Sequence, residues 1–482
     1  MQKQLNQPSV LVWLIGISAL ILFVASGVRH ELLNSGAWDL GIFDQGVYLI
    51  SQGKSPISSF LGFHILADHA AWILYPIALL YKIYPSVYWL FAVQAIALAI
   101  AAWPTYQLAV QAGLKEKQAV TLSIVYLLYP LIFNISLFDF HPDVIAVPAI
   151  LAAVLAARNK NIYGFCLYVL IVLGCKAVFG LTVAAMGVWL WGWEKRKLFG
   201  AIALLSGVTW FIISTQIIIP FLGSSSASVA RHIYRYSYLG DSFSAIAQNL
   251  LSNPLLIFSK LFTFANLSYL LLLVSPVIWG LSFAGLTPLI AGIPQLALNL
   301  LADYHHQKNL IFQYSLPILP FLLLAVIKTL ATGKGWLHKR KAIILWSLVA
   351  FLSLGKYGYF WSKYLKYLDN WQATREAIAQ VQDQGSVYTT DIIAPHLSQR
   401  QYIQYTNYYE PVKDLNQFDY ILLNLRHTGL WSYEPELASK LCNQVKNISE
   451  FELNYQRDDV YLFIKKSSNS ELANAVNQNL HR

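Results

Sequence analysis

Residues 10–26 read VLVWLIGISALILFVAS, and residues 35–70 read SGAWDLGIFDQGVYLISQGKSPISSFLGFHILADHA. The first stretch is long enough to cross a bilayer as a helix, because about 20 residues span the hydrocarbon core. The second stretch begins shortly after the end of this predicted helix. Its acidic and imidazole side chains are Asp39, Asp44, His64, Asp68 and His69. Such groups are expensive to hold beside a membrane, so they usually do chemistry or bind ions.

The composition is that of a membrane protein. Of 482 residues, 56% are apolar and 12% are charged, whereas soluble domains average about 25% charged residues. The net charge of +10 arises largely from Lys and Arg clusters between apolar runs, a pattern typical of cytoplasmic loops rather than of nucleic-acid binding. We therefore expect an α-helical polytopic protein of the plasma (inner) membrane, surrounded by membrane lipids and without a nucleic-acid partner.

The apolar runs predict a transmembrane domain over residues 1–362 with about eleven helices. The expected spans are 10–27, 86–112, 120–137, 144–157, 162–173, 178–191, 199–221, 254–274, 276–301, 310–329 and 342–361. The run 70–84 is short for a span and ends at Tyr84-Pro85, so we expect an interfacial helix there. With this assignment every basic short loop lies on one face, which places the N-terminus in the cytoplasm and the loops rich in Asp, His and Tyr outside.

Charged and polar residues return after residue 362 and predict a small extracytoplasmic α/β domain over 363–466. Its expected helices are 371–384 and 435–445, and its expected strands are 387–390, 402–405, 420–423 and 460–464. The polar tail 467–482 has the composition of a disordered segment.

Asp39 and Asp44 are the candidate catalytic residues. Five positions on a helix turn two side chains roughly 140° apart, so we expect Asp39 to cap a short juxtamembrane helix and Asp44 to project from it. One of the two then acts as a base or a metal ligand. The alternative is a capping residue and a solvated carboxylate.

His64 and Asp68 are four positions apart and would share one face of a helix, with His69 alongside. This arrangement suits a divalent ion, Mg²⁺ or Mn²⁺, or an imidazole oriented by a carboxylate. The alternative is simply the polar start of an interfacial helix.

Further polar residues on the same expected face are candidates for substrate binding. Asp139 and His141 lie in a short outer loop, where Asp143 is expected only to cap the next helix. The adjacent pair His305 and His306 forms another cluster, or an ordinary polar loop.

Cations on the outer face are expected to clamp an anionic headgroup such as a lipid phosphate. Lys176 lies between two apolar helices, and Arg231 and Arg235 flank Tyr234 four positions apart. Snorkelling or pairing with a carboxylate is the alternative.

The run Asp39-Leu40-Gly41-Ile42-Phe43-Asp44-Gln45 resembles a family of bacterial and archaeal integral membrane proteins grouped with the glycosyltransferase C (GT-C) fold. The resemblance covers residues 10–360, and further matches are Phe63-His64 with His69, Leu128-Tyr129-Pro130, Asp139-Phe140-His141 and 292–321. Relatives carry Lys-Glu-Asp where this chain has Lys176-Ala177-Val178. The missing acidic pair leaves open an altered or lost activity.

The resemblance implies a GT-C-like fold with juxtamembrane helices in the first outer loop and a soluble outer domain. It implies a glycosyltransferase that moves a sugar from a polyprenyl-phosphate donor to an acceptor, with an Asp of the first loop as the base of an inverting reaction. The alternatives are a transporter or lipid-handling protein, and an inactive GT-C-like scaffold.

Overall fold

The computed structural model describes residues 9–223, 233–429 and 436–466. The chain divides into two compact units. The helical unit comprises Met1–Ser26, Leu66–Ile73 and Leu90–Tyr357, and the loop–sheet unit comprises Gly27–Ile65, Leu74–Trp89 and Gly358–Arg482. The tail predicted to be disordered, 467–482, lies outside the described residues.

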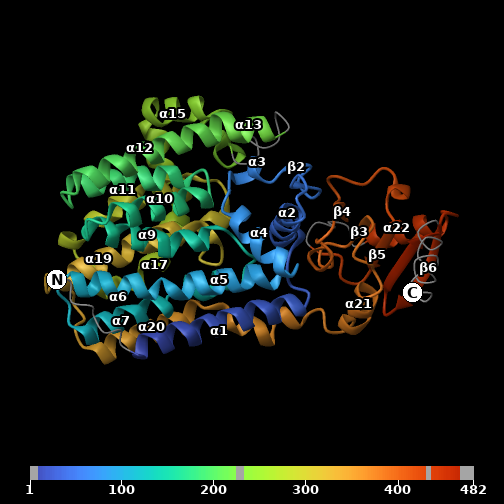
Figure 1. Ribbon diagram of the computed structural model, residues 1–482, viewed down its shortest axis with the longest axis horizontal. Helices are drawn as coiled ribbons and strands as arrows, with labels where there is room; N and C mark the ends of the chain where they lie inside the picture. The colour runs from blue at the N-terminus through green and yellow to red at the C-terminus, as the bar shows by residue number, and fades with distance from the viewer. Residues whose placement is uncertain (1–8, 224–232, 430–435, 467–482) are drawn as a thin grey trace. The chain divides into compact units, whose positions relative to one another are not determined.

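The helical unit holds most of the apolar runs of the sequence as helices (Figure 1). They are α1 (Ser9–Glu31), α3 (Leu66–His69), α5 (Tyr88–Ile100), α6 (Ala102–Gln111), α7 (Glu116–Leu127), α8 (Pro130–Ser136), α9 (Asp143–Arg158), α10 (Ile162–Cys175), α11 (Phe179–Gly192), α12 (Lys197–Ile213), α13 (Ile219–Leu222), α15 (Phe243–Ser252), α16 (Pro254–Leu261), α17 (Phe264–Val274), α18 (Ile293–Leu301), α19 (Leu319–Ala331) and α20 (Arg340–Leu354). Polar residues set some of the boundaries. The Asn161 side chain accepts a hydrogen bond of 3.0 Å from the Gly164 amide at the start of α10, which satisfies a donor that the helix leaves open.

Five described segments are long and apolar enough to cross a membrane, and the number rises to seven if each of two bent helix pairs forms one span. The five are Ser9–Glu31, Tyr88–Gln111, Lys197–Leu222, Gln313–Ala331 and Arg340–Leu365. Shorter apolar helices of 10–17 residues, such as α10 and α11, lie between them in the sequence. The chain is therefore an integral membrane protein, and the total of about eleven spans stays a prediction.

The segment 276–301 is not the continuous helix that the sequence predicted. Three 3₁₀ turns, Ile278–Gly280, Phe283–Gly285 and Thr287–Gly292, come before α18. Prolines and glycines interrupt this run at Pro276, Gly280, Gly285, Pro288 and Gly292. Proline lacks the amide hydrogen that a helix needs, and irregular backbone at membrane depth is tolerated where protein covers it.

The helices α11 and α12 pack closely against each other through glycines (Figure 1). A Cβ atom on Gly187 would lie 2.6 Å from the carbonyl oxygen of Gly200, and one on Gly180 would lie 2.6 Å from the carbonyl oxygen of Gly207. Small residues let two helix backbones approach in a membrane, where packing rather than the hydrophobic effect drives association. The glycines thus fix how α11 and α12 meet.

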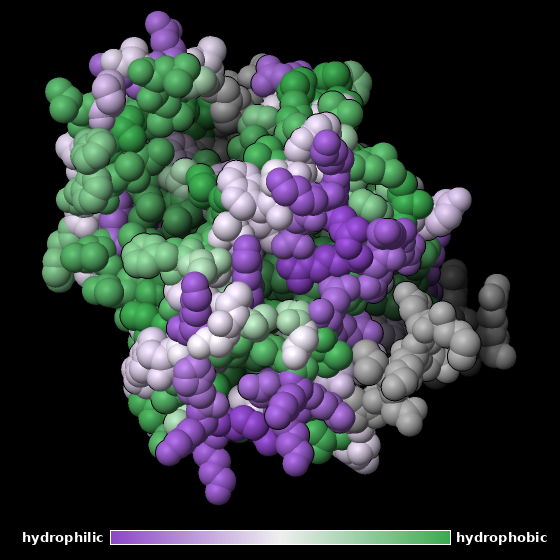
Figure 2. All heavy atoms as spheres, turned by 90° about the vertical axis from the view of Figure 1, so that its left-hand side faces the viewer, coloured by the Kyte–Doolittle hydropathy of each residue, from purple (hydrophilic) through white to green (hydrophobic). Residues whose placement is uncertain are grey.

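Figure 2 shows hydrophilic side chains gathered over part of one face, with hydrophobic side chains beside them. The exposed charged residues Lys115 and Lys195 lie in connections between helices, and the exposed Lys117 and Lys197 lie in the first turns of α7 and α12. Large apolar side chains are exposed along the helices themselves, among them Trp13, Leu20, Tyr163 and Leu205. An exposed apolar surface on helices of this length is suited to contact with lipid.

The loop–sheet unit contains a five-stranded sheet in the order β4-β3-β5-β7-β6. The strands are β3 (Val387–Thr389), β4 (Ile403–Tyr405), β5 (Tyr420–Asn424), β6 (Phe451–Arg457) and β7 (Val460–Lys465). The strands β3, β4 and β5 are parallel, and β7 is antiparallel to β5 and β6. Sequence analysis missed β6, an edge strand whose side chains are mostly exposed and which therefore lacks an apolar pattern.

Two helices accompany this sheet, α21 (Trp371–Ile378) and α22 (Leu437–Lys446). The helix α22 packs on β5 and β6, where Cys442 and Val445 share a buried core with Ile421 and Leu423. The helix α21 is shorter than predicted and packs against β5 and β7.

The first outer loop belongs to the same compact unit as the sheet. It forms the π-helical turn Ala37–Gly41, then α2 (Ile42–Ser51), a hairpin of β1 (Ile57–Ser58) and β2 (Phe63–His64), and later α4 (Leu74–Ile83). The helix α2 and the short helix α4 lie in the segments where short helices were expected, and their positions at the membrane surface stay predictions. The unit is therefore larger than the expected domain 363–466.

Candidate functional site

Asp44 lies in the interior of the loop–sheet unit, with 1% of its surface exposed. The Tyr81 hydroxyl donates to Oδ1 at 2.6 Å, Gln399 Nε2 donates to Oδ1 at 3.1 Å, and the Ser398 hydroxyl donates to Oδ2 at 2.6 Å. Burial raises the pKa of the Asp44 carboxyl, although the three hydrogen bonds oppose this shift. The alternative of a solvated carboxylate is therefore wrong for Asp44, because residues from α4 and from the C-terminal part of the chain enclose it.

Asp39 lies inside the π-helical turn Ala37–Gly41 and is only partly buried. The N-cap of this turn is Gly36, which makes no side-chain hydrogen bond, so Asp39 is not the capping residue that the sequence predicted. Of the two acidic residues in the Asp39–Gln45 run, Asp39 is the one that solvent or a ligand can reach.

A polar segment directly after β3 was missed by sequence analysis. It reads DIIAPHLSQR over residues 391–400 and is almost entirely buried. Asp391 Oδ1 accepts a hydrogen bond of 3.3 Å from the Ala37 amide, and the Arg400 guanidinium donates to the carbonyl oxygens of Leu397, Gly385 and Gln382. A polar run at the carboxyl end of a parallel strand is a recognised position for binding residues, and this signal was readable in the sequence.

His396 of this segment lies flat against His30, with the ring centroids 4.0 Å apart and the planes at 22°. His30 Nδ1 lies 3.0 Å from the Ser35 hydroxyl. His396 Nε2 is buried and has no hydrogen-bond partner among the described residues. Burial lowers the pKa of the His396 imidazole to about 4, so this side chain is neutral at physiological pH.

In the helical unit, two of the predicted cations lie over the same aromatic ring. Lys176 Nζ lies 5.9 Å from the centroid of Tyr314, and Arg235 Cζ lies 5.3 Å from it. Arg235 also lies 4.8 Å from the ring of Tyr304 and 5.7 Å from the ring of Tyr234. We call these five residues the cation–tyrosine cluster. Tyrosine faces attract cations, which explains how two positive side chains are held near each other.

Lys176 forms an ion pair with Asp143, at 3.4 Å between Nζ and Oδ1. Both side chains are largely buried. Asp143 is the first residue of α9 after Pro142, and it does not act as the N-cap that the sequence predicted. A carboxylate thus accompanies Lys176 after all, although it comes from a position 33 residues earlier in the chain instead of from the residues next to it.

Aromatic contacts extend the cation–tyrosine cluster to two of the predicted histidines. Tyr304 lies 4.7 Å from His306, and His306 lies 4.5 Å from Phe312. Phe138 in turn lies 4.8 Å from Phe312 and 5.2 Å from the ring of His141. Segments that are far apart in the sequence therefore form one continuous aromatic surface.

The remaining candidates differ in their surroundings. His141 Nδ1 lies 2.9 Å from the carbonyl oxygen of Asp139, which places Asp139 beside the same aromatic surface. His305 is exposed in the 3₁₀ turn His305–Lys308. Arg231 lies outside the described residues.

The predicted metal site has a different local structure from the one expected. His64 belongs to strand β2 and Asp68 to helix α3, so they do not share a helix face. Asp68 Oδ2 lies 3.4 Å from His69 Nε2. Among the described residues, no group of three or more His, Cys, Asp and Glu side chains is arranged to hold a metal ion. The divalent ion stays a prediction.

Comparison with solved structures shows what this fold is similar to. The crystal structure of ArnT from Cupriavidus metallidurans bound to undecaprenyl phosphate superposes with a TM-score of 0.50 and 10% identity, over 95% of this chain and 98% of that chain. The apo state of the same protein gives a TM-score of 0.40 and 10% identity, over 93% of this chain and 98% of that chain. At this identity the likeness to the bound form shows the fold alone.

No curated protein matches the chain. The family described as "Predicted membrane protein (DUF2079)" matches residues 29–462, a range that includes α2, the cation–tyrosine cluster and the sheet as far as the start of β7. The chain belongs to this family of membrane proteins.

Proposed function

We propose that this protein is a membrane glycosyltransferase that moves a sugar from a polyprenyl-phosphate donor to an acceptor on the extracytoplasmic face. The observation that carries the proposal is the position of Lys176 and Arg235 over one ring, that of Tyr314. The fold likeness to ArnT, a protein whose structure holds undecaprenyl phosphate, supports a polyprenyl phosphate as the ligand.

The charges of the cation–tyrosine cluster suit a phosphodiester. Lys176 and Arg235 carry two positive charges and Asp143 carries one negative charge, which leaves about one positive charge to balance a singly ionised sugar–phosphate–lipid. Arg235 Nε is buried without a hydrogen-bond partner among the described residues, and a phosphate oxygen would supply the missing acceptor. A buried donor of this kind is costly until it is paired.

In the proposed reaction the acceptor hydroxyl oxygen attacks the anomeric carbon of the sugar, and the bond from that carbon to the phosphate oxygen breaks. The polyprenyl phosphate leaves with one additional negative charge, which Lys176 and Arg235 stabilise. A carboxylate takes the proton of the acceptor hydroxyl. The single displacement inverts the configuration at the anomeric carbon.

Asp39 is the better candidate for the base. A general base must reach the proton that it removes, and Asp39 is partly exposed whereas Asp44 is enclosed by Tyr81, Ser398 and Gln399. Asp44 instead anchors α2 within the loop–sheet unit.

The test uses the purified full chain with radiolabelled polyprenyl-phosphate sugars. We expect Asp39→Asn to lower transfer by about 10²–10⁴-fold while donor binding persists, and Asp39→Glu to retain part of the activity. Arg235→Gln should weaken donor binding, whereas Arg457→Gln, at an exposed ion pair of the sheet, should not. Transfer that is unchanged in Asp39→Asn would exclude this base, and donor binding without transfer from any sugar would indicate an inactive scaffold.

A transporter needs polar groups that line a path through the helices. The buried polar groups of α18 are instead satisfied within the protein: Gln295 donates to Asn299 at 3.0 Å, and Asn299 donates to the Tyr269 hydroxyl at 2.9 Å. Tyr269 is in turn 2.9 Å from the Ser315 hydroxyl. This closed network holds α17 and α18 to the segment before α19, and it gives the transport alternative no support.

A further inference from the structure

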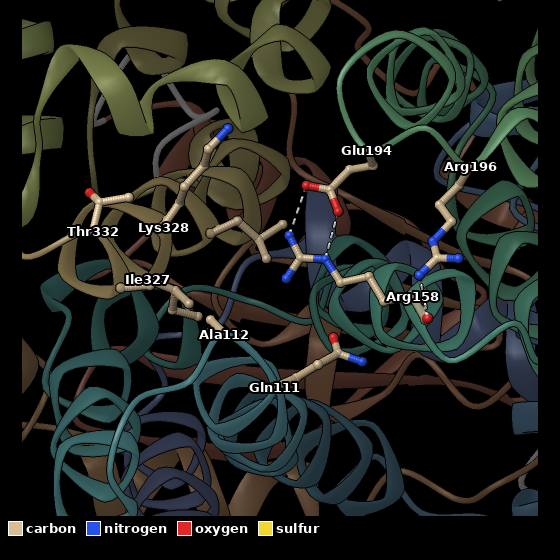
Figure 3. Close-up of a pocket in the computed structure, with 10 residues that line it drawn as sticks. Gln111, Ala112, Arg158, Glu194, Arg196, Ile327, Lys328 and Thr332 are labelled. Atoms are coloured by element: carbon tan, nitrogen blue, oxygen red, sulfur yellow. Dashed lines mark hydrogen bonds and ion pairs between the residues drawn. The ribbon is translucent and has the colours of Figure 1, made fainter.

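A cavity of about 480 Å³ opens among helix ends in the helical unit (Figure 3). Arg158 is the last residue of α9, Arg196 directly precedes α12, and Lys328 lies in the last turn of α19. Figure 3 shows Arg158 and Glu194 on one side of the cavity and Lys328 on the other. Three cations and one carboxylate therefore surround a space that has no role in the proposed sugar transfer.

The cavity is separate from the cation–tyrosine cluster. Asp143, which pairs with Lys176, begins α9, and Arg158 ends the same helix. A helix of 16 residues is roughly 22 Å from first to last residue. The two positive sites thus lie at opposite ends of α9.

Among the described residues that line the cavity, Glu194 is the only acidic one, and one of the cations binds both of its carboxylate oxygens. Arg158 Nε donates to Oε2 at 2.9 Å and Arg158 Nη2 donates to Oε1 at 3.0 Å. This bidentate contact uses both carboxylate oxygens of Glu194 and holds the Arg158 guanidinium in a fixed orientation. Arg158 keeps its Nη1 donors, for which the described residues provide no hydrogen-bond acceptor.

The other two cations bond to neutral groups. Arg196 Nη2 donates to the carbonyl oxygen of Arg158 at 2.9 Å, and Lys328 Nζ donates to the Thr287 hydroxyl at 2.7 Å. Neither contact neutralises a charge, so the lining has about two positive charges more than negative ones. Positive groups that face one cavity repel each other unless an anion lies between them.

We propose that this cavity binds a phosphate group. Guanidinium and ammonium groups are the usual hydrogen-bond donors to phosphate in proteins, and here they converge from several helices. The surplus of two positive charges would balance the two negative charges of a doubly ionised phosphate monoester. Basic cavities between membrane helices bind lipid headgroups, and the apolar side chains of Leu324 and Ile327 line the same space. The phosphate therefore comes from an anionic phospholipid or from a soluble phosphate.

Binding to the full-length protein in detergent tests this proposal. The probes are dioctanoyl phosphatidic acid, dioctanoyl phosphatidylcholine and inorganic phosphate. We expect phosphatidic acid to bind and phosphatidylcholine not to bind. Competition by inorganic phosphate would identify a soluble phosphate as the source, and no competition would identify the lipid.

Variants separate this cavity from general attraction to a basic surface. Lys328→Gln and Arg196→Gln should each weaken binding of phosphatidic acid roughly tenfold, whereas Lys339→Gln, at an exposed position outside the cavity, should leave it unchanged. Glu194→Gln should tighten binding, because it removes the only negative charge of the lining; a purely structural role for these residues predicts no such gain. Equal weakening in all three lysine and arginine variants, or no binding of either phosphate probe, would overturn the proposal.

Discussion

The stacked pair of His30 and His396 predicts that the loop–sheet unit loses stability in acid. Burial lowers the pKa of His396 from 6.5 to about 4; the nearby Glu31 opposes this shift and Arg375 adds to it. Because the folded-state pKa is depressed, folding favours the neutral imidazole. The stability that depends on this neutral form is complete above pH 6.5 and is lost as the pH falls toward 4.

The size of the effect follows from proton linkage. At about pH 5 an unfolded chain holds the proton on His396 and the folded chain does not, and each pH unit between the unfolded pKa and the working pH is worth about 1.4 kcal/mol. From the ordinary value of 6.5 this gives about 2 kcal/mol of lost stability. For a unit of this size the loss lowers the melting temperature by roughly 4–8 °C.

The assay is thermal unfolding of the detergent-solubilised protein at about pH 7.5 and about pH 5. His396→Phe keeps an aromatic ring against His30 and removes one of the two buried, titratable imidazoles of the stacked pair, so its melting temperature should change less between the two pH values. His305→Phe alters an exposed histidine and should behave as the unmodified protein does. If the melting temperature of His396→Phe fell between about pH 7.5 and about pH 5 by as much as that of the unmodified protein, His396 would not be the cause of the acid destabilisation.

Three substitutions test the contacts that hold the two units in shape. Asp44→Asn removes an acceptor from buried donors, which should cost about 1–3 kcal/mol and lower the melting temperature; an unchanged value would contradict the buried environment. Lys176→Gln leaves the buried Asp143 uncompensated and should destabilise by about 3–5 kcal/mol, and the additional change Asp143→Asn should restore much of the loss. Gly187→Leu should reduce the yield of folded protein in size-exclusion chromatography because backbone of α12 blocks the added side chain, whereas Gly192→Leu has open space around the Cβ position and should be tolerated.

The apolar runs of the sequence predicted the helices well wherever hydropathy alone decides the structure. A run of lipid-compatible residues has to satisfy its own backbone hydrogen bonds, and a helix does this locally. The prediction failed at 276–292, where the run is just as apolar but prolines and glycines break the hydrogen-bond ladder. The edge strand β6 was missed for the opposite reason, since its polar side chains carry no apolar alternation.

The candidate residues of the helical unit were found because charge is rare there. Lys176, Arg235 and His141 stand out in an apolar background, and the structure brings them to one aromatic surface. Their partners were harder to foresee. The sequence pattern predicted that Asp143 caps a helix. In the structure its carboxylate, at the start of α9, pairs with Lys176, which directly follows α10.

The two carboxylates of the Asp39–Gln45 run illustrate the limit of reasoning from spacing. The spacing predicted a capping Asp39 and a projecting Asp44, yet the burial of Asp44 depends in part on Ser398, which lies 354 positions later in the chain. The segment after β3 contacts the π-helical turn and the helix that follows it, because Asp391 accepts from the Ala37 amide in the turn and Ser398 donates to Asp44 in α2. Asp39 lies between these two contacts.

The segment after β3 therefore influences the proposed sugar transfer without contributing the base, since it sets the orientation of the turn that carries Asp39. On this reasoning Ser398→Ala should lower sugar transfer while Asp39 itself is intact, and Ser398→Thr, which keeps the hydroxyl, should restore it.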